Sequence, residues 1–171
     1  MPIDSRMIDN MKADRVRKVA DLANRRTRER FGRFLIEGPQ SVREAVTWMP
    51  DAVRDLYVQA ADGPDGPRIA GETLTSIVER SQEHRIYVHP ASEAVMRRIS
   101  PDCQGIAAVG DADAVRATAQ GTQLPEEPFV AAFWQVRDPG NAGTVIRAAD
   151  AAGCDAVVFV DDCVDMLNPK V

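Results

Sequence analysis

The sequence has few cysteines, few aromatic residues and no long apolar run. Its 171 residues include three cysteines, and aromatic residues make up 5% of the total. Cys103, Cys154 and Cys163 are widely spaced without a Cys-x-x-Cys pair, which argues against a disulfide framework and a zinc site. No apolar run approaches the roughly 20 residues that cross a membrane, and the N-terminus lacks the apolar core of a signal peptide. These absences favour a cytoplasmic protein with no membrane partner and no bound metal.

Charge is unevenly distributed along a chain whose net charge is −5. Residues 1–34 contain ten Lys and Arg against five Asp and Glu, whereas residues 35–171 contain eleven against twenty-one. A basic segment on an acidic protein fits a local contact with a polyanion, although it does not require one. Hydrophobic residues make up 44% of the sequence, which suits a packed core.

Apolar residues recur at helical spacing between residues 8 and 30, and this pattern predicts one amphipathic helix. Arginines crowd its expected C-terminal end. The helix macrodipole favours cations at that end, and a phosphate-binding patch would need them there too, so both explanations stay open. The candidate residues of such a patch are Arg25, Arg26, Arg28 and Arg30.

An alternation of strands and helices follows and predicts a complete α/β domain over residues 1–110. The expected strands cover residues 33–37, 53–59, 85–89 and 105–110, the expected helices cover residues 38–48, 73–81 and 91–99, and a Gly- and Pro-rich loop covers residues 60–71. Residues 111–128 are polar, end in Pro125-Glu-Glu-Pro128 and are expected to be a linker, with one exposed helix possible over residues 111–119.

Residues 129–171 are expected to begin a second α/β domain. The apolar runs Phe129 to Val136 and Ala156 to Val160 predict two buried parallel strands, with Trp134 in the core and one helix between them. A parallel sheet is normally covered by helices on both faces, and two strands alone are marginal. We therefore expect residues 129–171 to be the incomplete N-terminal part of a larger domain. Either the chain is a fragment or a partner supplies the missing strands.

The turn and helix between these strands carry the candidate catalytic residues, Asn141 and Arg147. We expect Asn141 to cap the helix, so that the amides of residues 142–144 are free and attract an anion. Gly143 would leave room for Arg147 to reach toward the helix start, where a guanidinium suits a phosphate. An alternative stays open, in which Arg147 simply pairs with Asp150 and the Asp138-Pro-Gly-Asn141 segment is an ordinary turn.

Two other kinds of site are weakly supported. A dinucleotide-binding fold has the same outline, but residues 140–145 contain no Gly-x-Gly. Asp161, Asp162 and Asp165 do not have the spacing of a metal-binding loop. His84 and His89 flank one predicted strand and receive no role.

Four stretches resemble SpoU-type RNA ribose 2′-O-methyltransferases of the TrmH-like, knotted SPOUT superfamily. Asp138-Pro139-x-Asn141-x-Gly143-x-x-x-Arg147-x-Ala149-x-Ala151-x-Gly153 resembles the first methyltransferase motif. Phe34-Leu35-Ile36-Glu37-Gly38 and the later run from Ser100 to Val109 resemble the opening and the closing strand of the substrate-binding domain. The ending from Val164 to Val171 resembles the segment that enters the next helix of the family.

The resemblance implies a fold and an activity. An α/β/α substrate-binding domain akin to small kink-turn-binding ribosomal proteins would precede a knotted domain that holds S-adenosylmethionine, usually in a homodimer. Arg147 would position or activate a ribose 2′-hydroxyl of ribosomal or transfer RNA, and Asn141 would shape the site. Separately from the resemblance, we expect Arg25, Arg26, Arg28 and Arg30 to contribute to RNA affinity.

The cofactor-binding motifs of the family would lie beyond Val171, so we expect this chain alone neither to bind the cofactor well nor to methylate RNA. The alternatives are a non-catalytic RNA-binding module within residues 1–110 and a nucleotide-binding α/β protein.

Overall fold

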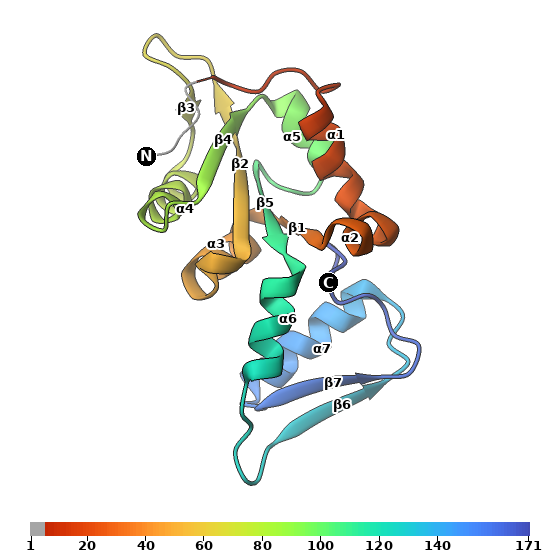
Figure 1. Ribbon diagram of the computed structural model, residues 1–171. Coiled ribbons are helices and arrows are strands. Elements are labelled where there is room, and N and C mark those ends of the chain that lie inside the picture. The colour runs from red at the N-terminus through yellow and green to blue at the C-terminus, as the bar shows by residue number, and fades with distance from the viewer. Residues whose placement is uncertain (1–5) are drawn as a thin grey trace. The chain divides into compact units, whose positions relative to one another are not determined.

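The structure, a computed structural model, describes residues 6–171, apart from the side chains of residues 117–119. It contains two compact units, Met1–Val115 and Arg116–Val171 (Figure 1). None of the helices described combines the length and apolar composition that crossing a bilayer requires.

A five-stranded mixed sheet forms the centre of the first unit. Strand β5 lies between β1 and β2 and is antiparallel to both, whereas β4 pairs in parallel with the other edge of β2, where the short β3 also pairs. The strands are β1 (Arg33–Glu37), β2 (Val53–Ala61), β3 (Arg68–Ile69), β4 (Tyr87–Ala91) and β5 (Ile106–Asp111).

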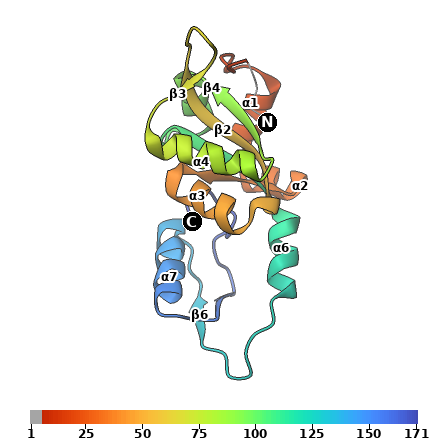
Figure 2. The same cartoon turned by 90° about the vertical axis from the view of Figure 1, so that its left-hand side faces the viewer.

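Helices cover both faces of this sheet and confirm the predicted α/β/α domain. Val16, Val95 and Met96 of the first layer pack against Leu35 and other residues of one face. The second layer packs its own apolar residues on the opposite face (Figure 2). The first layer holds α1 (Asp14–Ala20), the 3₁₀ turn η1 (Asp21–Ala23), α2 (Arg25–Phe31) and α5 (Glu93–Ile99), and the second holds α3 (Gly38–Trp48), the 3₁₀ turn η2 (Pro50–Ala52) and α4 (Glu72–Glu83).

Strand β2 contains a bulge that decides which face two of its residues take. Val53 lies opposite Gly110 and Asp55 lies opposite Val109, so Arg54 is an extra residue on β2. Because side chains alternate along a strand, one extra residue reverses the alternation. Val53 therefore packs with the α3–α4 layer, whereas Asp55 shares the α1 side of the sheet with Tyr57.

The prediction of one helix over residues 8–30 is wrong. Ile8 is extended and forms a bridge with Ala91, and the helical segment begins at Asp14 and is interrupted after Ala23. Asn24 has an extended backbone, and its side chain accepts a hydrogen bond from the amide of Arg26 at 2.9 Å. A capping asparagine thus starts a second helix where the apolar periodicity suggested one continuous helix.

The predicted loop and the predicted linker contain more regular structure than expected. Within residues 60–71, β2 continues to Ala61 and β3 pairs with it. The linker begins with helix α6 (Ala112–Gly121) because Asp111 Oδ1 accepts hydrogen bonds from the amides of Asp113 and Ala114. The helix that the sequence allows over residues 111–119 is therefore present as α6.

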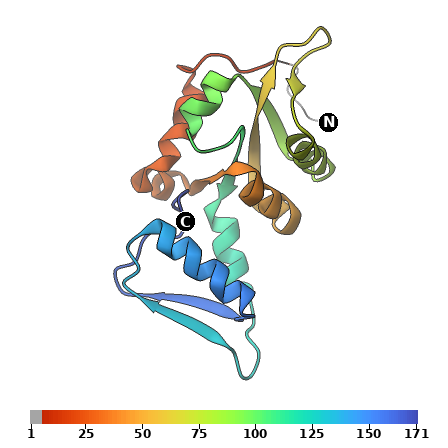
Figure 3. The same ribbon diagram turned by 180° about the vertical axis from the view of Figure 1, so that it is seen from behind.

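The second unit has the predicted βαβ connection but not the predicted burial. Strands β6 (Val130–Trp134) and β7 (Ala156–Val160) are parallel and are joined by α7 (Pro139–Ala151), which lies along one side of them (Figure 3). Alternate residues of the strands are exposed, and 67% of the Trp134 side-chain surface is accessible, so its expected core position is wrong. One helix covers one face of a sheet, and the residues of the other face remain exposed.

Candidate functional sites

Helix α7 begins at Pro139, three residues earlier than predicted, and its cap is Asp138 rather than Asn141. The Asp138 carboxylate accepts a hydrogen bond from the Asn141 amide at 2.8 Å. A proline suits the first position of a helix because its missing N–H has no partner there. The amide of Ala142 already donates to the carbonyl of Asp138, so the expected cluster of free amides at residues 142–144 is not formed. Gly153 does adopt the predicted left-handed conformation, with φ at 75°.

Arg147 extends toward the start of α7, as its spacing from Gly143 predicted. Its Nη2 atom lies 3.3 Å from Thr144 Oγ1. A Cβ placed on Gly143 would come within 3.1 Å of Arg147 Nη1 and within clashing distance of the Val171 carbonyl oxygen. Glycine at 143 is therefore required for the guanidinium and the backbone of Val171 to approach the helix together.

The Arg147 guanidinium is exposed and has no ion pair with any carboxylate in residues 6–171. The alternative in which it pairs with Asp150 is thus not the arrangement observed. The side chain of Asn141 is also exposed and makes no hydrogen bond to another described residue. Two side chains of the motif therefore present unused hydrogen-bonding groups on the first turns of one helix.

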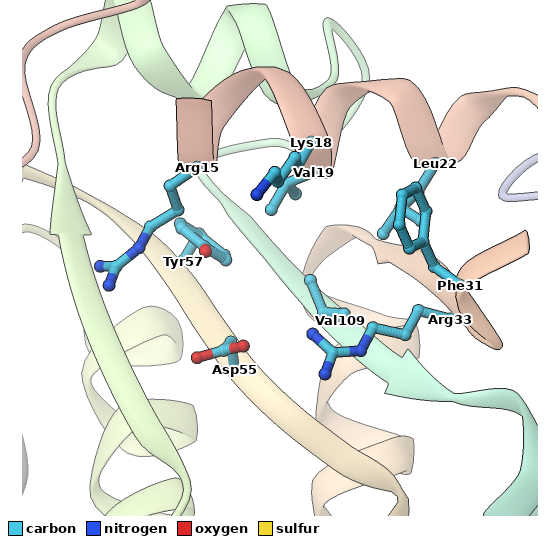
Figure 4. Close-up of a pocket in the computed structure, with 9 residues that line it drawn as sticks. All are labelled: Arg15, Lys18, Val19, Leu22, Phe31, Arg33, Asp55, Tyr57 and Val109. Carbon is cyan, nitrogen blue, oxygen red and sulfur yellow. The ribbon is translucent and has the colours of Figure 1, made fainter. Parts of the chain in front are cut away.

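A cavity of about 510 Å³ lies in the first unit between α1–α2 and the sheet (Figure 4). Arg15 and Arg33 extend toward Asp55 from two sides. The residues that line it are Arg15, Lys18, Val19, Leu22, Phe31, Arg33, Asp55, Tyr57 and Val109.

A hydrogen-bonded chain fixes the polar side of this cavity. His89 Nε2 lies 2.9 Å from Asp55 Oδ1, and Arg15 Nη1 lies 3.2 Å from His89 Nδ1. Arg15 can only donate, so His89 Nδ1 accepts and Nε2 carries the proton that it donates to Asp55. The buried imidazole is also packed between the rings of Tyr57 and Tyr87.

This arrangement shifts the pKa values of two cavity groups in opposite directions. The hydrogen bond from His89 lowers the pKa of Asp55 below its ordinary value, aided by the charges of Arg15 and Arg33 and opposed by burial. Burial, with a smaller effect of the Asp55 charge, raises the pKa of Tyr57. At neutral pH the cavity therefore presents a carboxylate acceptor beside a phenol donor.

Comparison with known proteins identifies both halves of the chain. Residues 13–108 match the MRM3-like substrate binding domain, and residues 128–171 match the SpoU rRNA Methylase family. The chain belongs to the MRM3-like, SpoU-type family. The resemblance found in the sequence motifs is therefore confirmed.

Individual relatives agree with this family assignment. The 23S rRNA (guanosine(2553)-2′-O)-methyltransferase RlmP of Bacillus subtilis is 33% identical over 170 residues, which are 96% of this chain and 58% of that protein. The chain thus spans little more than half the length of this relative. A crystal structure of an AdoMet-bound rRNA methyltransferase from Sinorhizobium meliloti superposes with a TM-score of 0.71 at 20% identity, covering 98% of this chain and 58% of that chain. This structural likeness shows a shared fold.

The four arginines predicted to bind RNA in the MRM3-like domain are not equivalent. Arg28 has 3% of its surface exposed and donates to the carbonyls of Leu22 and Ala23, both at 2.8 Å. It therefore joins η1 to α2, and its guanidinium is not presented to a ligand. Arg25 pairs with Glu29 on the helix surface, whereas Arg26 and Arg30 line a second cavity of about 300 Å³.

The sequence pattern did not indicate the residues that line the cavity of the MRM3-like domain. Asp55 interrupts an apolar strand, and His89 ends the strand predicted over residues 85–89. Neither position indicates that these two residues, 34 apart in the sequence, are hydrogen-bond partners. The bulge at Arg54 also places Val53 and Asp55 on opposite faces, whereas simple alternation would place them on the same face. No group of three or more His, Cys, Asp or Glu side chains within residues 6–171 is arranged to hold a metal ion.

Proposed function

We propose that this chain is the substrate-binding domain and first catalytic segment of an S-adenosylmethionine-dependent RNA ribose 2′-O-methyltransferase. The observation that carries the proposal is Arg147, an exposed guanidinium directed along α7 without a carboxylate partner among the described residues. The match of residues 128–171 to the SpoU rRNA Methylase family supports it. Ribosomal RNA is the proposed substrate, because the B. subtilis relative is named for 23S rRNA.

The residues of this chain would act on the ribose side of the reaction. S-adenosylmethionine, when bound, supplies the methyl group, and the resemblance assigns its pocket to residues beyond Val171. Arg147 can only donate hydrogen bonds, so it would hold a backbone phosphate and stabilise negative charge as the 2′-hydroxyl loses its proton. Asn141 would orient the ribose with its exposed amide, and Gly143 keeps the space in which Arg147 lies.

Substitution of Arg147 tests this assignment in the longest reading frame that contains the sequence. We expect Arg147→Ala to reduce methyl transfer to ribosomal RNA by roughly 100-fold or more, because removing one donor at a developing charge has that effect. Arg137→Ala is the matched control, since Arg137 is exposed in the same unit and pairs loosely with Asp162 at 3.4 Å. Ribose methylation is scored as resistance of the adjacent phosphodiester to alkali.

Undiminished activity in Arg147→Ala, or methyl groups found on bases rather than ribose, would contradict the proposal. Transfer RNA in a parallel reaction distinguishes the two RNA classes. The bacterial relative supports a cytoplasmic location. The resemblance also supports a homodimer, which light scattering of the same protein tests through its molar mass.

A further inference from the structure

The cavity under α1 and α2 has a composition that restricts what it can bind. Three cations, Arg15, Lys18 and Arg33, surround one carboxylate, Asp55, in a protein whose net charge is negative. Lys18 and Arg33 make no hydrogen bond or ion pair to any residue that the structure describes. A local excess of positive charge with unused donors favours an anionic ligand.

The walls of the cavity are apolar and partly aromatic. Val19, Leu22 and Val109 are buried beneath it, and Phe31 has 51% of its surface exposed at its edge. An exposed aromatic ring among cations is a surface on which an unpaired base stacks. The ligand should therefore have a flat apolar body as well as a negative charge.

The polar groups within the cavity require hydrogen-bonding partners on the ligand. Tyr57 is 2% exposed, and its hydroxyl makes no hydrogen bond to any residue described. Figure 4 shows it among the lining residues, beside Arg15 and Asp55. Because His89 donates to Oδ1, Asp55 is held in place while Oδ2 has no partner within residues 6–171. A carboxylate only accepts, so the ligand must bring an N–H donor.

A second cavity continues the first and shares Lys18 and Phe31 with it. Arg26 and Arg30 line this continuation. A chain of phosphates that left the first cavity would therefore meet two further guanidinium groups, which is the arrangement expected along a single strand of nucleic acid.

We propose that the first cavity binds one unpaired RNA nucleotide whose base carries an amino group. The amino group donates to Asp55, the base packs against the apolar wall, and a phosphate lies between Lys18 and Arg33. Inorganic phosphate alone would be repelled by the Asp55 carboxylate, and a purely apolar ligand would leave Lys18 and Arg33 without a partner. This inference rests on the proposed function in one respect, which is that the nucleotide belongs to the RNA substrate.

Nucleoside 5′-monophosphates test the site in the 171-residue chain without any methylation assay. Amide chemical shifts are followed by NMR as GMP, AMP, CMP, UMP, ribose 5-phosphate or inorganic phosphate is added. We expect the shifts to map to Lys18, Phe31 and Asp55, with the three amino-bearing nucleotides binding roughly tenfold more tightly than UMP and both base-free phosphates. The imino N–H of uracil lies between two carbonyl oxygens that repel the Asp55 carboxylate, so it does not replace an amino group.

Three variants separate the contributions to binding. Asp55→Asn should give the four nucleotides similar affinities. An uncharged amide both donates and accepts hydrogen bonds, so it no longer favours a base that carries an amino group. Lys18→Gln should weaken all four by roughly tenfold, the usual effect of a lost charge-assisted contact. Arg43→Gln, on α3 across the sheet, is the matched control and should change neither property. A thermal unfolding curve for each variant establishes that it is folded.

The proposal is overturned if base-free phosphate binds as tightly as the nucleotides, if the shifts map away from the cavity, or if Asp55→Asn retains base discrimination. If any of these results is found while the longer protein still methylates ribose, the nucleotide site is rejected and the proposed function stands. If nucleotides bind in the cavity but the longer protein does not methylate RNA, the nucleotide site stands and the proposed function is rejected.

Discussion

Asp55 shows how a single residue connects the core of the first unit to its surface. One of its carboxylate oxygens accepts a hydrogen bond from the buried His89, and 31% of its side chain is exposed to the cavity. The imidazole holds Arg15 through its other nitrogen at 3.2 Å. The three side chains therefore form one hydrogen-bonded unit, in which Arg15 and Asp55 are held on opposite sides of the same imidazole.

The lowered pKa of Asp55 predicts a loss of stability in acid. Because the folded state binds a proton less readily than the unfolded state, the contribution to the free energy of unfolding is complete above the unfolded value of about 3.9 and is lost as pH falls through the folded pKa. Urea unfolding between about pH 2 and pH 5 should therefore show a shallower pH dependence in Asp55→Asn than in the parent. Asp62→Asn, in an exposed loop, is the control, and parallel curves for Asp55→Asn and the parent would refute this account.

Several residue-level features could be predicted because short-range geometry decides them. The i, i+4 spacing placed Arg147 beside Gly143, and the glycine after the helix predicted the left-handed conformation of Gly153. The cap was mistaken because Asp138 and Asn141 are both good capping residues. Pro139 decides between them, because proline suits the first position of a helix and therefore favours Asp138 as the cap.

At the scale of elements, α2 shows that neighbouring arginines can have opposite roles. Arg28 bonds two backbone carbonyls at the η1–α2 junction, whereas Arg26 is exposed at the second cavity. Helical periodicity could not separate them, because the break at Asn24 changes which face of the segment is buried. The sequence also gave no sign that a 3₁₀ turn and a cap would interrupt the apolar pattern over residues 8–30.

A matched pair of substitutions in α2 separates these roles. We expect Arg28→Met to lower the free energy of unfolding by about 2 kcal/mol, because two inward-facing carbonyls lose their donor. Arg26→Met should leave stability nearly unchanged and should reduce the slope of log affinity for single-stranded RNA against log salt by about 0.7 if it contacts one phosphate. Urea unfolding and fluorescence anisotropy measure the two effects, and equal effects of both substitutions on stability would contradict the structure.

At the scale of the whole molecule, the two units differ in how completely their apolar surfaces are covered. The sheet of the first unit has helices on both faces, and its parallel and antiparallel pairings agree with a self-contained domain. The alternation of elements in the sequence was sufficient to predict this layering. Burial of β6 and β7 was overestimated because an apolar run predicts a strand but does not show whether a second layer is present.

Binding of S-adenosylmethionine by the 171-residue chain is the corresponding prediction for the molecule. We expect isothermal titration to detect no micromolar binding, because the resemblance places the cofactor-binding motifs after Val171. The longest reading frame that contains the sequence serves as the positive control. Micromolar binding by the 171-residue chain would show that residues 116–171 already supply a cofactor pocket.

The bulge at Arg54 is a position at which β2 can change length without exchanging its two faces. Val53 lies opposite Gly110 and Asp55 lies opposite Val109, with Arg54 as the extra residue between them. Deleting Arg54 would therefore leave a regular strand in which Val53 still packs with the α3–α4 layer and Asp55 still faces the cavity. Related proteins can accordingly gain or lose one codon here while the residues that surround the ligand keep both their identity and their side of the sheet.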